Sequence, residues 1–120
     1  MNNLGWMYRE GRGVAQNDSE AVRWFRAAVE AGSNYGMNSL AEMYEEGRGV
    51  ARDPAVAARW YLAAERLGDR WFRENVSARH SETIRSLHRL LRAAGHYRGA
   101  LDASWGPASL TALDAYVARR

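Results

Sequence analysis

The sequence predicts an all-α fold, in which helix-turn-helix units stack as an α-solenoid and a small C-terminal helical domain follows. Shifting the sequence by 36 residues aligns residues 2–32 with residues 38–68 without a gap, and 16 of the 31 aligned positions are identical. A fixed period of this length is typical of stacked repeat proteins. Within each repeat, apolar residues recur at the spacing of an amphipathic helix and glycines separate the helical stretches.

Each repeat contains two predicted amphipathic helices. The first carries the apolar stripe Leu40, Met43 and Tyr44 in repeat 2. The second carries apolar residues at positions i, i+3, i+4 and i+7 in both repeats. These residues are Ala21, Trp24, Phe25 and Ala28 in repeat 1, and Ala57, Trp60, Tyr61 and Ala64 in repeat 2. The aromatic pairs at equivalent positions are predicted to pack inside the repeats, and they are Tyr8 with Tyr44 and Trp24 with Trp60.

Glycine and proline mark the ends of these helices. Gly-Arg-Gly loops separate the two helices of each repeat and supply residues that adopt positive φ easily, and their glycines are Gly11, Gly13, Gly47 and Gly49. Gly32 and Gly68 stand where a helix C-terminus favours a left-handed residue. Asp53-Pro54 is a start signal, with Asp as N-cap and Pro at the first helical position.

The repeated pattern resembles a known family. Leu-x-x-Met-Tyr-x-x-Gly-x-Gly-Val followed by Ala-x-x-Trp-x-x-x-Ala-Ala-x-x-Gly is similar to the Sel1-like repeat, a relative of the tetratricopeptide repeat. The resemblance implies an adaptor surface for protein partners. It places repeat 1 at 1–32 and repeat 2 at 33–68, with a capping helix or degenerate third repeat at 69–80. Family repeats begin before this stripe, so we expect repeat 1 to be truncated at Met1 and any export signal to have been lost.

Residues 81–120 do not follow the 36-residue period and are predicted to form a separate helical module. Its first helix ends at Gly95, and Pro107 opens a second helix. The pattern places Ile84, Leu87, Leu90, Leu91 and Ala94 inward, and Arg85, His88, Arg89 and Arg92 outward.

The loop of this module resembles the small peptidoglycan-binding domain. Gly-His-Tyr-Arg-Gly at 95–99, Leu101-Asp102 and Trp105-Gly106-Pro107 carry the resemblance, whereas Ala103 replaces a usual glycine. It implies that Tyr97, Arg98, Asp102 and Trp105 bind a glycan-peptide strand. In the favoured alternative, Asp102 holds its own turn through backbone N–H groups, while Tyr97 and Trp105 close a small core.

Composition narrows the possible functions. Hydrophobic residues make up 47% and charged residues 26% of the 120 residues, which excludes a disordered or collagen-like chain. No uncharged apolar run approaches the roughly 18 residues of a membrane span, and the N-terminus lacks the pattern of a signal peptide. The absence of cysteine excludes disulfides and thiolate metal sites, but is compatible with either the cytosol or the periplasm.

Charged and titratable residues give no prediction of catalysis. His80, His88 and His96 recur every eight residues and lack the i, i+4 spacing of a helical metal pair, so no metal or cofactor is predicted. Glu45 and Glu46 are adjacent and point to different helix faces, so an enzyme is not predicted either. The net charge of +3 comes from residues 76–120, where 7 Arg against 3 acidic residues give +4, while residues 1–75 carry −1. Because no basic patch with exposed aromatics accompanies them, nucleic acid is not a predicted partner.

Together these observations predict a non-enzymatic binding protein of the bacterial cell envelope, where the resemblance points to a periplasmic location. Its repeats would bind a protein partner and its C-terminal module peptidoglycan. In the alternative, the chain is purely a protein-protein interaction scaffold whose residues 84–118 only cap the repeats, since about three repeats are usually needed for a stable stack. A homodimer through exposed repeat ends is a further expectation.

Overall fold

The computed structural model describes residues 2–76 and 79–118, and every regular element within them is helical. The all-α prediction is therefore confirmed. The helices are α1 (Asn2–Glu10), α2 (Asp18–Glu30), α3 (Asn34–Glu46), α4 (Pro54–Arg66), α5 (Trp71–Glu74), α6 (Ser81–Ala93) and α7 (Pro107–Ala118).

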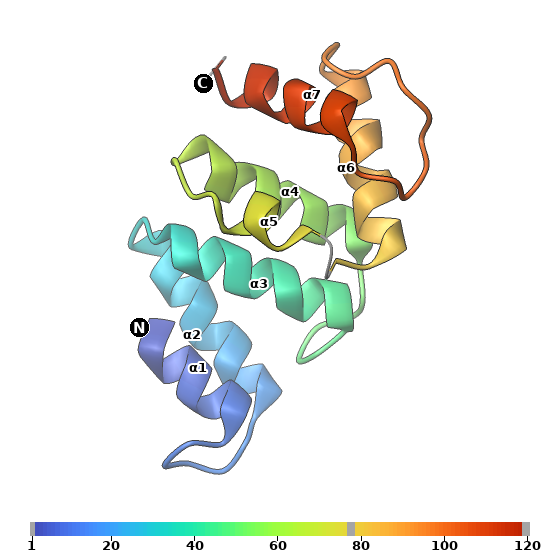
Figure 1. Ribbon diagram of the computed structural model, residues 1–120. Helices are drawn as coiled ribbons and strands as arrows, with labels where there is room; N and C mark the ends of the chain where they lie inside the picture. The colour runs from blue at the N-terminus through green and yellow to red at the C-terminus, as the bar shows by residue number, and fades with distance from the viewer. Residues whose placement is uncertain (1, 77–78, 119–120) are drawn as a thin grey trace.

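Helices α1 to α4 form two antiparallel pairs that stack in one direction, as an α-solenoid requires (Figure 1). Helix α1 pairs with α2 and α3 with α4, while α2 packs against α3 and so joins the two repeats. Helices α6 and α7 lie at the α4 end of this stack. The result is an elongated molecule of 46 × 25 × 20 Å.

The predicted helix ends are confirmed by their capping groups. The Asp53 carboxylate accepts hydrogen bonds from the backbone N–H groups of Ala55 and Val56, and Asn17 and Ser33 cap α2 and α3 through their side chains. The glycines of both Gly-Arg-Gly loops, together with Gly32, Gly68 and Gly95, have φ between 70° and 89°.

The core consists of two clusters of buried side chains. The smaller one joins α2 and α3 and contains Ala21, Val22, Phe25, Leu40 and Met43. The larger one extends from α3 to α7 and includes Tyr61, Phe72, Leu87, Leu91 and Leu113. Trp60 is half-buried and packs against both clusters. Tyr8 packs against the smaller cluster and Tyr44 against the larger one, so the prediction that packing explains these aromatic residues is confirmed for these three. Trp24 is also half-buried, and for Trp24 packing stays a prediction.

The segment 69–80 does not form the expected helix. Only Trp71–Glu74 is α-helical among the described residues of this segment, and residues 77 and 78 lie outside the described part of the chain. Asp69 accepts hydrogen bonds from the Asn34 side chain at 2.7 Å and from the Trp71 backbone N–H at 2.7 Å. The Asn75 side chain donates to the Trp71 carbonyl at 2.8 Å. These side-chain bonds to the backbone compete with helix propagation, so α5 is a single turn.

Helices α6 and α7 complete the core of repeat 2. Both pack against α4, and Ile84, Leu87, Leu91, Ala112 and Leu113 join the same buried cluster as Tyr61. The prediction that His88 faces outward with the arginines is wrong, because its side chain is fully buried. Histidine is a polar residue in sequence, but here both ring nitrogens have hydrogen-bond partners, the Asp102 carbonyl oxygen and the Ser109 hydroxyl.

Candidate functional site

A groove crosses one side of the repeats and is lined by residues of α1, α3 and α5. It encloses about 150 Å³, and its lining residues are Trp6, Tyr35, Asn38, Ser39, Glu42 and Trp71. Three helices that are separated in sequence by a full repeat therefore contribute to one concave surface. The stacking seen in Figure 1 brings these helices together.

Helix α3 forms the floor of the groove. Tyr35, Asn38, Ser39 and Glu42 are spaced i, i+3, i+4 and i+7, so they share one face of the helix. The neighbouring face is held close to α2 at Gly36, where a Cβ atom would lie 3.0 Å from the Cβ of Ala28. This close approach fixes which face of α3 lines the groove.

Three aromatic side chains border the groove. Tyr35 is 66% exposed, more than the other exposed large hydrophobic residues Leu67 and Leu110. Trp6 packs edge-on against Phe25, with ring centroids 6.0 Å apart. Trp71 stacks on Tyr61 with centroids 6.1 Å apart. Two of the three rings are thus anchored to core aromatics, while Tyr35 is free to contact a ligand.

Asn38 is the unusual polar residue of the groove. Its side chain is only 6% exposed, and neither its amide nitrogen nor its amide oxygen has a hydrogen-bond partner among the described residues. An unpaired buried polar group costs about 1–3 kcal/mol of stability. Both amide atoms are themselves buried, and they lack the partners that buried amides in native proteins nearly always have.

Carboxylates outnumber cations at the α1 side of the groove. Nη2 of Arg9 lies 3.4 Å from the Glu42 carboxylate and 3.6 Å from that of Glu46, and Nε of Arg9 lies 3.9 Å from Glu10. Burial raises the pKa of Glu42, and the positive charges of Arg9 and Arg79 oppose this effect only in part. Glu42 is therefore a largely buried carboxylate with other carboxylates close to it.

Below the groove, a buried polar network holds the repeat to the segment that follows it. Glu45 accepts hydrogen bonds from the Tyr61 hydroxyl at 3.1 Å, from Arg79 at 3.0 Å and from the His80 backbone N–H at 3.0 Å. Burial also raises the pKa of Tyr61. Glu45 is buried and Glu46 exposed, so the adjacent carboxylates point to different faces as predicted.

Comparison with known families identifies the repeats. The Sel1 repeat family matches residues 1–33 and 34–69, which is more than half of the chain. The chain belongs to the Sel1 repeat family. Sel1 repeats are in general non-enzymatic interaction modules, which suggests protein partners for this chain. A search of curated proteins gave no match.

The Sel1 match ends at residue 69 and gives no support to a peptidoglycan-binding domain in the remainder. Beyond the Sel1 repeats, the aromatic residues of the predicted wall-binding loop pack internally. Tyr97 is buried, its hydroxyl donates to the Ala100 carbonyl at 2.8 Å, and its ring stacks on His88 with centroids 4.3 Å apart. Trp105 stacks on the same imidazole at 5.6 Å.

The two polar residues of that loop that were predicted to bind a ligand, Arg98 and Asp102, are exposed to solvent. Asp102 is exposed and its carboxylate accepts a hydrogen bond from the Ser104 backbone N–H at 3.1 Å, as the favoured interpretation predicted. Arg98 is also exposed. The structure thus brings Tyr97 and Trp105 to the same imidazole, and what the four residues Tyr97, Arg98, Asp102 and Trp105 bind stays a prediction.

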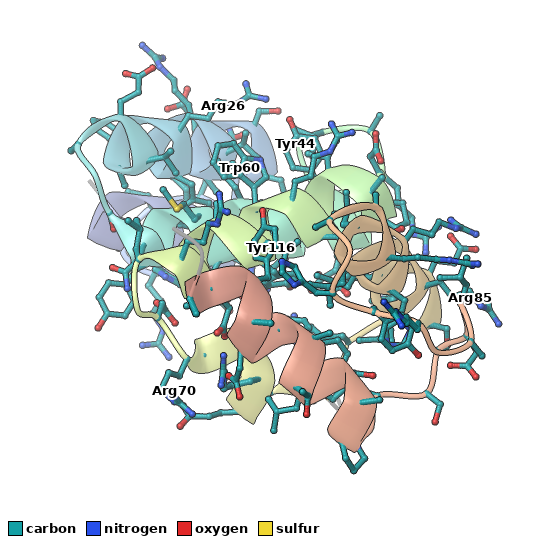
Figure 2. All side chains as sticks on the ribbon, turned by 90° about the horizontal axis from the view of Figure 1, so that it is seen from above. Arg26, Tyr44, Trp60, Arg70, Arg85 and Tyr116 are labelled. Carbon is teal, nitrogen blue, oxygen red and sulfur yellow. The ribbon has the colours of Figure 1, made fainter. Side chains whose placement is uncertain are left out.

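The exposed arginines of α6 do not form a uniformly basic binding site. Arg85, Arg89 and Arg92 are exposed, and Arg85 projects from α6 at the edge of the molecule (Figure 2). Arg85 and Arg89 border a shallow depression that also contains Asp53 and Glu82, so its charge is mixed. Within residues 2–76 and 79–118, no group of three His, Asp or Glu side chains could hold a metal ion. The same part of the chain contains no helix long and apolar enough to cross a membrane.

Sequence reasoning did not single out the groove residues Trp6, Tyr35, Asn38, Ser39, Glu42 and Trp71. A signal for four of them was present, because Tyr35, Asn38, Ser39 and Glu42 keep the i, i+3, i+4, i+7 spacing of one helix face. The contributions of α1 and α5 had no such signal, since they depend on how the Sel1 repeats stack.

Proposed function

We propose that this Sel1 repeat protein binds a segment of a partner protein in the groove between α1, α3 and α5. The observation that carries the proposal is the combination, in one concave surface, of an exposed aromatic ring at Tyr35 and an unpartnered amide at Asn38. Aromatic side chains provide large contact areas at protein interfaces. Binding surfaces owe their specificity to a small number of precisely placed polar groups, and an amide without a partner is such a group.

The proposal is tested by selecting ligands from a library of random 12-residue peptides displayed on phage. Binding of the enriched peptides is then measured to the unmodified protein and to Tyr35→Ala. Because Tyr35 is 66% exposed, its truncation should leave thermal stability unchanged, while affinity should fall about tenfold or more, as for an aromatic hot spot.

Leu110→Ala is the matched control, since Leu110 is 39% exposed and lies on α7, which contributes no residue to the groove. It should leave affinity unchanged. Enriched peptides that bind Tyr35→Ala as tightly as the unmodified protein would place the interaction elsewhere and overturn the proposal.

Wall binding by the C-terminal helices is a second candidate. One observation favours it, because Trp105 borders a surface depression of about 490 Å³ together with Pro107 and Leu110. Purified sacculi provide the test, in which the protein should co-sediment and Arg98→Ala should weaken the association. If the protein stays in the supernatant, wall binding is overturned, and the chain is an interaction scaffold that α6 and α7 cap.

The predicted homodimer is tested by molar mass from light scattering.

A further inference from the structure

We infer that the groove holds its partner as an extended peptide backbone through Asn38 and selects a basic side chain at Glu42. This inference rests on the proposed function and adds the chemistry of the ligand. It names two contacts that a peptide must make, and each follows from a different observation on the groove.

The first contact is to the backbone. Among the residues that the structure describes, Asn38 alone combines an unpartnered amide nitrogen with an unpartnered amide oxygen. A side-chain amide has donors on one atom and an acceptor on the other. A peptide group likewise presents an N–H and a C=O, so it can pair with both atoms at once. An extended segment exposes such groups at its edge, which a helical ligand does not.

The second contact is electrostatic. Arg9 lies within 4.0 Å of three carboxylates, those of Glu10, Glu42 and Glu46. Arg48 adds a positive charge near Glu46 at 3.8 Å, but its guanidinium already pairs with Asp18 at 2.8 Å. Glu42 is the one charged residue that lines the groove itself. A Lys or Arg side chain of the ligand would therefore balance an excess of negative charge.

The spacing of the two contacts fits an extended chain. Asn38 and Glu42 are one helical turn apart on α3, which is a rise of about 6 Å at roughly 1.5 Å per residue. Two residues of an extended chain span about the same distance, at roughly 3.3 Å each. The basic residue should therefore stand about two positions from the peptide group that Asn38 holds. Between them, apolar ligand atoms lie against Tyr35, Trp71 and Trp6.

The experiment uses the enriched peptides of the random 12-residue library. We expect them to share a Lys or Arg, and replacement of that residue by Gln should reduce affinity for the unmodified protein about tenfold. The Glu42→Gln variant should lose most of this preference. Methylation of one backbone nitrogen, about two residues from the basic side chain, should also weaken binding about tenfold.

Asn38→Leu separates binding from folding. It removes an unpaired buried amide, so the melting temperature should not fall, while peptide affinity should drop about tenfold or more. Asn38→Ala serves the same purpose if leucine does not fit, and it should give the same loss of affinity. Thr111→Ala, an exposed position on α7 outside the groove, is the control and should retain binding.

The outcomes distinguish this inference from the proposed function. Enriched peptides that depend on Tyr35, but lack a basic residue and tolerate Asn38→Leu, would overturn the inference and leave the groove as a binding site. Peptides that are indifferent to Tyr35→Ala, or a library without enrichment, would overturn both.

Discussion

The Nε2 atom of His88 in α6 lies 2.7 Å from the Oγ atom of Ser109 in α7. The Nδ1 atom of the same ring lies 2.8 Å from the Asp102 carbonyl oxygen, and Ser109 Oγ also accepts a hydrogen bond from the Gly106 backbone N–H at 3.3 Å. The buried imidazole is therefore fully paired. Its contacts connect both helices to the loop between them.

Ser109→Ala should destabilise the protein by about 1–3 kcal/mol, because it leaves the buried Nε2 atom of His88 without a partner. Urea unfolding provides the measurement. Ser104→Ala is the control, since Ser104 is exposed in the same loop and its side chain should contribute less than about 0.5 kcal/mol. Equal effects of the two substitutions would contradict a structural role for the His88–Ser109 pair.

Trp60→Ala should cost about 3 kcal/mol, the lower end of the range for a tryptophan packed in a core, because Trp60 is half-buried. It contacts both clusters, and Figure 2 shows it between α2 and α4. Trp24→Ala, at the equivalent position of repeat 1, should cost less, since Trp24 packs against neither cluster among the side chains that the structure describes. Chemical denaturation checks both, and a larger loss for Trp24→Ala would refute this account.

Gly49→Ala should destabilise more than Gly13→Ala, although the two glycines are equivalent in sequence. Both have positive φ, 73° and 77°, which costs about 1 kcal/mol for alanine. A Cβ atom at Gly49 would also lie 2.5 Å from the carbonyl oxygen of Asp18, whereas at Gly13 the nearest atom is the Cε of Met7 at 3.5 Å. Thermal unfolding of both variants measures the difference, and equal melting temperatures would show that the loop yields to the new methyl group.

Glu42→Gln should make the protein more stable than the unmodified chain near neutral pH. Burial raises the pKa of Glu42 from its ordinary value of 4.5, despite Arg9 and Arg79, and Glu45 and Glu46 add to the rise. Between that value and the raised pKa, the folded protein binds more protons than the unfolded chain. Glu42 therefore lowers the free energy of unfolding as the pH rises through this window.

Urea unfolding at about pH 4 and about pH 7 measures this linkage. The stability advantage of Glu42→Gln should be present at the higher pH and vanish at the lower one. An advantage that is larger at the lower pH would show that the ion pair with Arg9 outweighs the burial of Glu42.

Some features of the candidate site can be predicted from the sequence, and others cannot. The helical spacing of Tyr35, Asn38 and Glu42 is visible in the chain, because it depends on residues only one or two turns apart. That Asn38 has no partner is not visible, since pairing depends on the residues that α1 and α5 bring to it. His88 was misplaced for the same reason, because its partners Asp102 and Ser109 lie 14 and 21 residues away.

The repeat, its helices and their ends can be predicted from the chain alone, because periodicity, capping residues and positive-φ glycines act within a few residues of one another. Asp53, Gly47 and Gly68 act in this local way. Long-range packing sets the remaining features, which are the single turn of α5, the completion of the repeat 2 core by α6 and α7, and the groove across α1, α3 and α5. These features depend on contacts between residues far apart in the chain, and such contacts leave no periodic signal in the sequence.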